Sequence, residues 1–348
     1  MNKIESGDKL DFNDVLIRPK RSTLNSRSEV DLTREFKFKY SPKIWNGVPI
    51  IAANMDSTGT FEVYNCLSTF SIITALHKFY SIEDYRQFNA KSPDPNLFMV
   101  STGINHDAIS KLKDIFQVIQ CNWICIDIAN GYISKLVEFC KEVRKEFPDK
   151  IIVSGNVVTR EIVEELILNG KVDIVKVGIG PGSACTTRLK TGVGMPQLSA
   201  VLECSDAAHG VGGHIISDGG ITCPGDMAKA FGGGADFVMV GGRFAGHDQN
   251  PGDIKVIDGK QYKTFHGMSS DKAQETHYGK MNTYRTSEGR VLKIPYKGDL
   301  NETVQDYLGG LRSTCTYINA AKMKNMAKCT TYIRVSKQVN DLFNSSSS

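Results

Sequence analysis

The sequence predicts an α/β protein built as a single (β/α)8 TIM barrel, and three observations carry that prediction. Short runs rich in Val and Ile recur along the chain, each followed by a loop and a longer amphipathic segment. There are eight such runs, spaced about 20 to 40 residues apart, as strand–helix–strand units require. Their near-continuous apolarity is typical of parallel strands that are buried on both faces.

The eight predicted strands follow one another over the first two thirds of the chain, at residues 48–53, 72–76, 98–101, 123–128, 151–154, 173–177, 214–217 and 237–240. An open, doubly wound sheet is the alternative. It is less favoured because no G-x-G-x-x-G motif opens a helix after the first strand, and because eight regular units are many for an open sheet.

One intervening helix and one insertion can be placed within this pattern. Residues 132–147 carry apolar side chains at three-to-four spacing and are followed by Pro148, which predicts an amphipathic helix. Residues 267–298 are polar and glycine-punctuated, and we expect a mobile flap inserted after strand eight. The whole chain, residues 1–348, is then one barrel domain, and the serine-rich end at 345–348 is expected to be a disordered tail.

Composition excludes several classes of protein. The 348 residues are 41% hydrophobic and carry a net charge of only +4, with basic residues spread along the chain, so no nucleic-acid partner is expected. Nine scattered cysteines at no zinc-binding spacing favour a reducing compartment. The first residues lack the apolar core of a signal peptide, and no run approaches the roughly 18 apolar residues of a membrane span. We expect a soluble, cytoplasmic protein with no membrane partner.

The loops that follow the strands should form the active site, because barrel enzymes build their sites at the carboxyl ends of the strands. Glycine pairs follow strands seven and eight, at 219–220 and 241–242, and would let backbone N–H groups approach phosphate oxygens. Asp218 could accept hydrogen bonds from two ribose hydroxyls. Ordinary tight turns are the alternative reading, but two such pairs on adjacent strands favour a nucleoside monophosphate.

After strand six, residues 177–188 read V-G-I-G-P-G-S-A-C-T-T-R and place Cys185 in a glycine-rich loop. Only a thiolate is a strong nucleophile, and Thr186, Thr187, Arg188 and the loop N–H groups could stabilise one. A buried, inert thiol is the alternative, and it is our interpretation of the cysteines outside this loop at Cys66, Cys140, Cys204 and Cys329. Three histidines, His209, His214 and His247, share no pattern and are interpreted as structural, whereas His77 with Lys78 could contact an anion.

These motifs resemble a known family. The cysteine loop, T-G-V-G-M-P-Q, S-D-G-G, A-K-A-F-G-G-G-A-D-F-V-M-V-G-G and G-M-S-S are similar to motifs of the IMP dehydrogenase and GMP reductase family, from residue 12 to about residue 317. Two observations favour the GMP reductase branch. No room exists between Leu76 and Phe98 for the regulatory insertion of most IMP dehydrogenases, and the flap reads N-T-Y-R-T-S-E-G-R-V without their R-Y-F-like motif.

The resemblance implies NADPH-dependent reductive deamination of GMP to IMP and ammonia, as a step of purine salvage. Cys185 would attack purine C2, ammonia would leave to give a covalent thioimidate, and NADPH would deliver hydride to C2. Thr187 and Glu288 match the family's proton relay. An IMP dehydrogenase without its insertion and a non-catalytic purine-nucleotide-binding protein are the alternatives.

The resemblance also implies three sets of binding residues and a homotetramer. The nucleotide set comprises Ser183, Asp218, Gly219, Gly220, Gly241, Gly242, Gly267, Met268, Ser269, Arg285, Thr286, Ser287 and Gly289. The dinucleotide set comprises Ser26, Arg27, Lys78, Asp127, Ile128, Ala129, Ile179, Gly180, Met268, Tyr284, Arg285, Ser313, Thr314, Cys315 and Thr316. Potassium would be held by Gly180, Gly182, Cys185 and Arg188. Lys78 and Arg27 would favour the 2′-phosphate of NADPH. Departures from the family pattern are Met195, Phe79 and His266.

Overall fold

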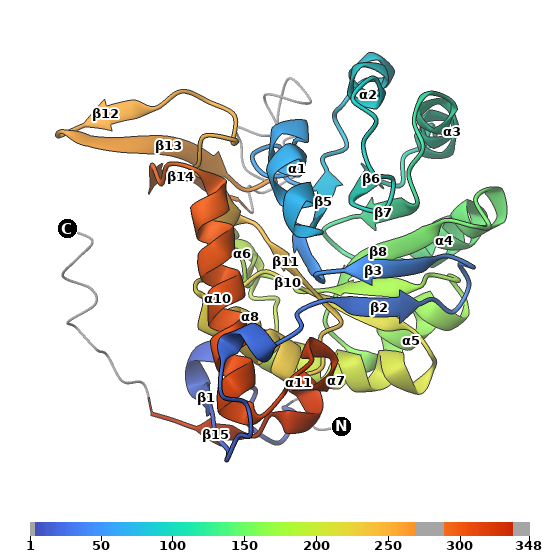
Figure 1. Cartoon of the computed structure of the whole chain (residues 1–348). Helices are drawn as coiled ribbons and strands as arrows, with labels where there is room; N and C mark the ends of the chain where they lie inside the picture. Colours follow the sequence, from blue (N-terminus) through green and yellow to red (C-terminus); the bar gives the residue numbers. More distant parts are fainter. Residues whose placement is uncertain (1–3, 269–288, 337–348) are drawn as a thin grey trace.

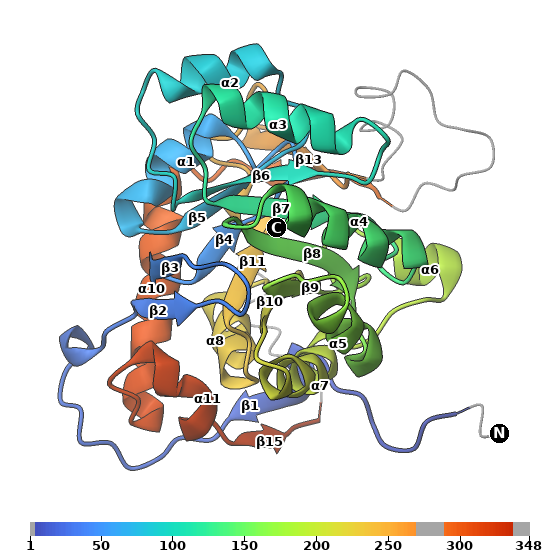
Figure 2. The same ribbon diagram turned by 90° about the vertical axis from the view of Figure 1, so that its right-hand side faces the viewer.

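The computed structural model describes residues 4–268 and 289–336, and its centre is a closed barrel of eight parallel strands (Figure 2). The barrel strands are β4 (Ile50–Ala52), β5 (Ile73–Leu76), β6 (Phe98–Thr102), β7 (Trp123–Asp127), β8 (Ile151–Val157), β9 (Ile174–Val177), β10 (His214–Asp218) and β11 (Phe237–Val240). Strand β11 pairs with β4 and closes the ring. The predicted (β/α)8 barrel is confirmed, and the open sheet is excluded.

Helices lie around the barrel (Figure 1). They are α1 (Phe61–Leu67), α2 (Ile82–Asn89), α3 (Ala108–Val118), α4 (Ser134–Glu146), α5 (Arg160–Leu168), α6 (Thr187–Thr191), α7 (Gln197–Gly210), α8 (Pro224–Gly232), α10 (Leu300–Ile318) and α11 (Met326–Cys329). All of these except α6, which buries no side chain, contribute apolar side chains to the core. Helix α4 is the one predicted at 132–147, and it buries Leu136, Phe139, Cys140 and Val143. In residues 4–268 and 289–336, no helix is both long and apolar enough to cross a bilayer.

A hairpin closes the amino-terminal end of the barrel. Strands β2 (Arg34–Lys37) and β3 (Ile44–Gly47) pair with each other and contribute Phe36 and Trp45. The Phe36 ring stacks on Phe237, the first residue of β11, at 4.6 Å, and the Trp45 ring lies 6.1 Å from that of Trp123, the first residue of β7. This hairpin lies in a segment with no sequence signal beyond a polar arm.

Further segments extend this core. A three-stranded antiparallel sheet of β12 (Lys255–Ile257), β13 (Lys260–His266) and β14 (Val291–Pro295) projects from the barrel (Figure 1). Part of the expected irregular insertion at 267–298 is therefore regular strand, and its residues 269–288 lie outside the described part. Strand β1 (Val15–Ile17) follows the short helix η1 (Phe12–Asp14) and pairs with β15 (Tyr332–Arg334).

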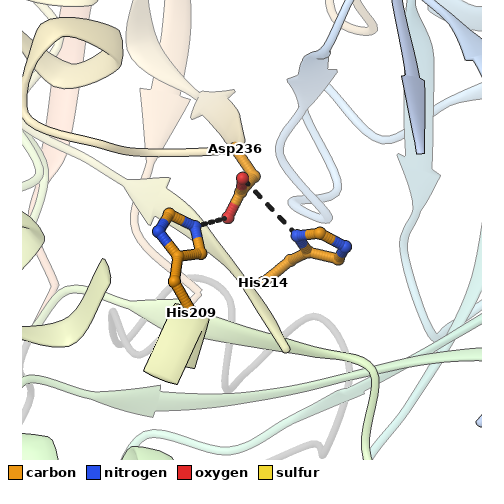
Figure 3. Close-up of side chains that lie close together, drawn as sticks. All are labelled: His209, His214 and Asp236. Atoms are coloured by element: carbon orange, nitrogen blue, oxygen red, sulfur yellow. Dashed lines mark hydrogen bonds and ion pairs between the residues drawn. The ribbon is translucent and has the colours of Figure 1, made fainter. Parts of the chain in front are cut away.

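Two aspartates repeat one arrangement at the amino ends of the strands. Asp173 precedes β9, accepts a hydrogen bond from Ile152 N of β8, and pairs with Arg144 of α4 at 2.5 Å. Asp236 precedes β11 and accepts one from Ile215 N of β10. Its other partners are His209 Nε2 at 2.8 Å and His214 Nδ1 at 3.5 Å (Figure 3). Each carboxylate therefore ties a helix to a neighbouring strand, which agrees with a structural role for both histidines.

Candidate active site

Cys185 and Thr187 lie together in the loop after β9. Cys185 Sγ is 3.1 Å from Thr187 Oγ1, and both side chains are half-buried. The Cys185 amide donates to the carbonyl of Gly182 at 3.0 Å, which curls the backbone around the sulfur. By contrast, Cys66, Cys140 and Cys204 are buried, and burial raises the pKa of Cys140 and Cys204 to about 12 and that of Cys66 to about 11. Those three thiols fit the expected inert role, whereas Cys329, also predicted to be buried, is only half-buried.

The two predicted glycine pairs lie against the cysteine loop from either side. A Cβ added at Gly219 would lie 2.9 Å from Pro181 Cγ, and one added at Gly242 would lie 2.9 Å from Ser183 Oγ. Gly219 and Gly220 also have φ of +92° and +78°, where a side chain is strained. The loops after β9, β10 and β11 therefore meet around one space, as a phosphate site built from backbone groups requires.

The carboxyl-terminal end of the predicted flap is joined to the cysteine loop. Gly289 forms an antiparallel bridge with Cys185, and Arg290 N donates to the Ala184 carbonyl at 2.9 Å. The Arg290 guanidinium donates twice to the Ser183 carbonyl, at 3.0 and 2.7 Å. Gly267 N donates to the Arg290 carbonyl at 3.2 Å, so Gly267 and Gly289 both lie beside the cysteine loop. The predicted residues Ser269, Tyr284, Arg285, Thr286, Ser287 and Glu288 lie outside the described part.

A buried lysine joins the predicted nucleotide and dinucleotide residues. Lys176 Nζ lies 2.9 Å from Asp127 Oδ1 and 2.8 Å from Asp218 Oδ2, and its side chain is only 4% exposed. Burial disfavours the charged form of each partner, yet the mutual attraction outweighs it, lowering the pKa of Asp127 and raising that of Lys176. Asn54 donates to Asp127 Oδ2 at 3.0 Å, and Asn156 donates to Asp218 Oδ2, the oxygen that Lys176 also contacts, at 2.8 Å. Both aspartates are thereby held at fixed positions.

Lys78 lies at the carboxyl end of β5 and lines a cavity of about 180 Å³. Ser101, Asn105 and Lys111 also line it, and Lys111 Nζ donates to the Lys78 carbonyl at 3.1 Å. Asp107 is the one acidic residue of the lining, so two cations against one carboxylate, beside hydroxyl and amide groups, suit an anionic group. Lys78 thus shares the carboxyl ends of the strands with Asp127, Ile128, Ala129, Ile179 and Gly180.

The other predicted dinucleotide residues form a second group. Ser26 caps the short helix η2 (Arg27–Glu29), which packs against α10, where Ser313, Thr314, Cys315 and Thr316 lie. Arg27 is exposed, whereas Cys315 is fully buried inside α10, so the structure does not offer it to a ligand as predicted. The predicted dinucleotide residues therefore form two groups. One lies on η2 and α10, and the other, with Lys78, lies at the carboxyl ends of the barrel strands.

Arg188 packs across the cysteine loop. An added Cβ at Gly180 would meet Arg188 Cγ at 2.5 Å, so the arginine stem covers this glycine. Its guanidinium donates to the carbonyl of Met195 at 2.6 Å and lies 3.5 Å from Asp11 Oδ2. Only the backbone carbonyl of Met195 is used, so this departure from the family pattern leaves the contact intact.

Several site residues were missed by sequence reasoning. Lys176 interrupts an apolar strand, and a lysine there requires a carboxylate partner, which is a usable signal. Gln197 Nε2 donates to the carbonyls of Val177 and Asp218, at 2.9 and 3.3 Å, and joins the ends of β9 and β10. Gln197 and Arg290 give no such signal, because polar residues in loops and at helix starts are common. Asn156 gives none because it follows the predicted strand at 151–154, although the structure places it inside β8.

Comparison with known proteins agrees with this geometry. The model of the IMP dehydrogenase / GMP reductase domain matches residues 9–341. GMP reductase 2 of Homo sapiens is 57% identical over 345 residues, covering 99% of both chains. GMP reductase 2 of Mus musculus is 56% identical, covering 99% of this chain and 100% of the relative. GMP reductase of Vibrio vulnificus (strain YJ016) is 56% identical, covering 98% and 99%. The chain therefore belongs to the IMP dehydrogenase / GMP reductase family.

Proposed function

We propose that this enzyme is an NADPH-dependent GMP reductase that converts GMP to IMP and ammonia. The observation that carries the proposal is the Cys185–Thr187 pair at 3.1 Å, in a loop enclosed by two glycine turns. The similarity to GMP reductases over nearly the full chain supports it. We also propose that residues 1–348 form one barrel domain with a flap at 267–298, and that the protein works in the cytoplasm, where its nine free cysteines stay reduced.

The chemistry assigned to the chain begins at Cys185. Its thiolate bonds to C2 of the purine, the exocyclic amine takes a proton and leaves as ammonia, and a thioimidate remains on the sulfur. Thr187, beside the sulfur, and Glu288 supply that proton. When bound, NADPH would supply a hydride for C2, and the Cys185 thiolate would be released as the leaving group. GMP, NADPH and two protons thus give IMP, ammonium and NADP⁺.

The nucleotide would be oriented by the three loops. The amides around Gly241 and Gly242, with the exposed Ser183 hydroxyl beside them, suit the phosphate. The Asp218 carboxylate, held by Lys176 and Asn156, suits the ribose hydroxyls. This arrangement leaves the purine between the ribose site and Cys185.

The residues present also fit the cofactor and the cation. Lys78 and Lys111 line a cavity whose charge suits a phosphate of the dinucleotide. Gly180, with φ of +81°, and Gly182 offer neutral carbonyl oxygens, which suit a weakly hydrated cation such as potassium.

The test is turnover of GMP with NADPH, followed by nicotinamide absorbance and by IMP and ammonia formation. Cys185→Ala is expected to bind GMP but to lose at least about 10³-fold in kcat, the scale of losing a covalent nucleophile. Cys223→Ala, at an exposed cysteine elsewhere, is the matched control and should keep full activity. Absence of wild-type turnover at every potassium concentration would refute the proposal, and faster oxidation of IMP by NAD would favour an IMP dehydrogenase.

A further inference from the structure

Two lysines of the projecting sheet bind the backbone of the loop after β11. Lys297 follows β14, and its Nζ lies 2.9 Å from the carbonyl oxygen of Ala245, 3.2 Å from that of Arg243 and 3.5 Å from that of Gly242. Lys263 of β13 donates to the carbonyls of His247 and Asn250, at 2.9 and 2.8 Å. Two ammonium groups thus bind the main chain of residues 242–250.

Neither ammonium pairs with a carboxylate among residues 4–268 and 289–336. Lys263 is 6% exposed, and burial lowers the pKa of Lys297 to about 8, with a further contribution from Arg243. A buried ammonium is costly unless its hydrogen bonds are satisfied, and here only main-chain carbonyls satisfy them. The two ammonium groups therefore stabilise the main-chain conformation of residues 242–250.

The hydrogen bonds from Lys297 fix the orientation of the peptide groups that they reach. In a trans peptide, the carbonyl of one residue and the N–H of the next point in opposite directions. Holding the carbonyls of Gly242 and Arg243 toward Lys297 turns the amides of Arg243 and Phe244 the other way. The Phe244 amide closes the turn onto the Gly241 carbonyl at 2.9 Å, so Lys297 stabilises the same turn from its outer side.

We propose that Lys297 is a positioning residue for nucleotide binding, which holds the Gly241–Gly242 turn in the orientation that receives the 5′-phosphate. The inference rests on the proposed function and deepens it. Both contacts to the site come from residues that flank β14. Arg290, directly before this strand, binds the cysteine loop, and Lys297 follows the strand after Tyr296. The positions of the cysteine loop and of the Gly241–Gly242 turn therefore both depend on β14.

The test compares two ligands that differ only in the phosphate. Calorimetric titration of Lys297→Met should show GMP affinity reduced about tenfold, the effect of one lost charge-assisted hydrogen bond, with guanosine affinity unchanged. Lys297→Arg should restore part of the GMP affinity, since a guanidinium also donates to carbonyls. Lys293→Met, at an exposed lysine of the same strand, is the matched control and should bind both ligands as wild type does.

The outcomes are separable. Equal weakening of GMP and guanosine, or no weakening, overturns the role of Lys297. A wild type that binds no GMP overturns the proposed function instead. If Lys297→Met does not fold, the wild type is titrated across the pKa of about 8, and GMP affinity should fall relative to guanosine as Lys297 deprotonates. Four charged or titratable groups lie nearby: Arg243, His247, Asp248 and Tyr296. His247 stays neutral there because its pKa is lowered to about 4, and the hydrogen bond to Asp248 raises the pKa of Tyr296. A constant ratio overturns the proposal.

Discussion

At the scale of single residues, Lys176 is a buried cation that compensates the charges of two carboxylates. Asp127 and Asp218 come from different strands and both bind this one ammonium. Removing one member of a buried ion network leaves the others charged without compensation, which costs more than the network itself contributes.

Lys176→Met should therefore lower the free energy of unfolding by about 3 to 5 kcal/mol, because two carboxylates would face each other inside the barrel. Lys113→Met provides the comparison, since the Lys113–Glu146 pair at 2.6 Å is largely exposed and should contribute less than about 1 kcal/mol. Urea denaturation of both variants measures the difference. Similar losses would show that burial of Lys176 does not determine its contribution.

The site residues differ in how far the sequence could predict them. Cys185, Asp218 and the glycine pairs follow predicted strands, so the barrel geometry alone brings them together. Arg290 and Lys297 could not be predicted, because their partners are backbone carbonyls, and any segment of any sequence offers those. Where a side chain binds main chain, only the folded arrangement identifies the partner.

At the scale of elements, the loop after β11 contains a buried histidine that should make stability depend on pH. His247 Nε2 lies 2.7 Å from Thr303 Oγ1, and burial, followed by the charge of Lys297, lowers the pKa of His247 from 6.5 to about 4. A lowered pKa in the folded state favours the neutral ring. The stabilisation is therefore complete above pH 6.5 and is lost as the pH falls toward 4.

Between pH 7 and 4, this histidine should account for a loss of roughly 2 to 3 kcal/mol of unfolding free energy. Denaturation of wild type and His247→Gln at both pH values measures it as the difference in pH dependence. His214 acts in the opposite sense: burial disfavours its charge but Asp236 raises its pKa, so its contribution is lost as the pH rises. His106→Gln, at an exposed histidine, should leave the wild-type profile unchanged; an unchanged profile in His247→Gln would contradict the assignment.

The elements also mark where sequence patterns suffice. Each predicted barrel strand overlaps an observed one, because strands buried on both faces are apolar throughout and stand out from amphipathic helices. The β12–β14 sheet escaped prediction, since its strands are mostly exposed and β14 ends in Lys, Ile and Pro. Exposed antiparallel strands read as polar loops unless their partners are known.

At the scale of the whole molecule, apolar side chains next to the cysteine loop are open to solvent. Leu189 of α6 is 84% exposed and Val193 is 56% exposed. Exposed large apolar side chains beside a functional loop are typical of a protein interface. If the protein forms the homotetramer that the family resemblance implies, a contact between copies would cover α6.

Leu189→Lys should then shift the protein to smaller species, which light scattering after size exclusion would detect, and should lower turnover because α6 begins at Thr187. Leu168→Lys, at a leucine of α5 that is 41% exposed, is the matched control and should leave the assembly intact. An unchanged mass for Leu189→Lys would exclude α6 from the interface.

The pairing of β1 with β15 has a consequence for biosynthesis. The segment from Asp11 to Ile17 carries Asp11, which contacts Arg188 and the Gln197 amide beside the cysteine loop. Its strand finds its hydrogen-bond partners only in Tyr332–Arg334. Chains leave the ribosome amino end first, at about 5 to 20 residues per second. Strand β1 must therefore wait until the whole barrel and β15 have been made before it can pair with β15.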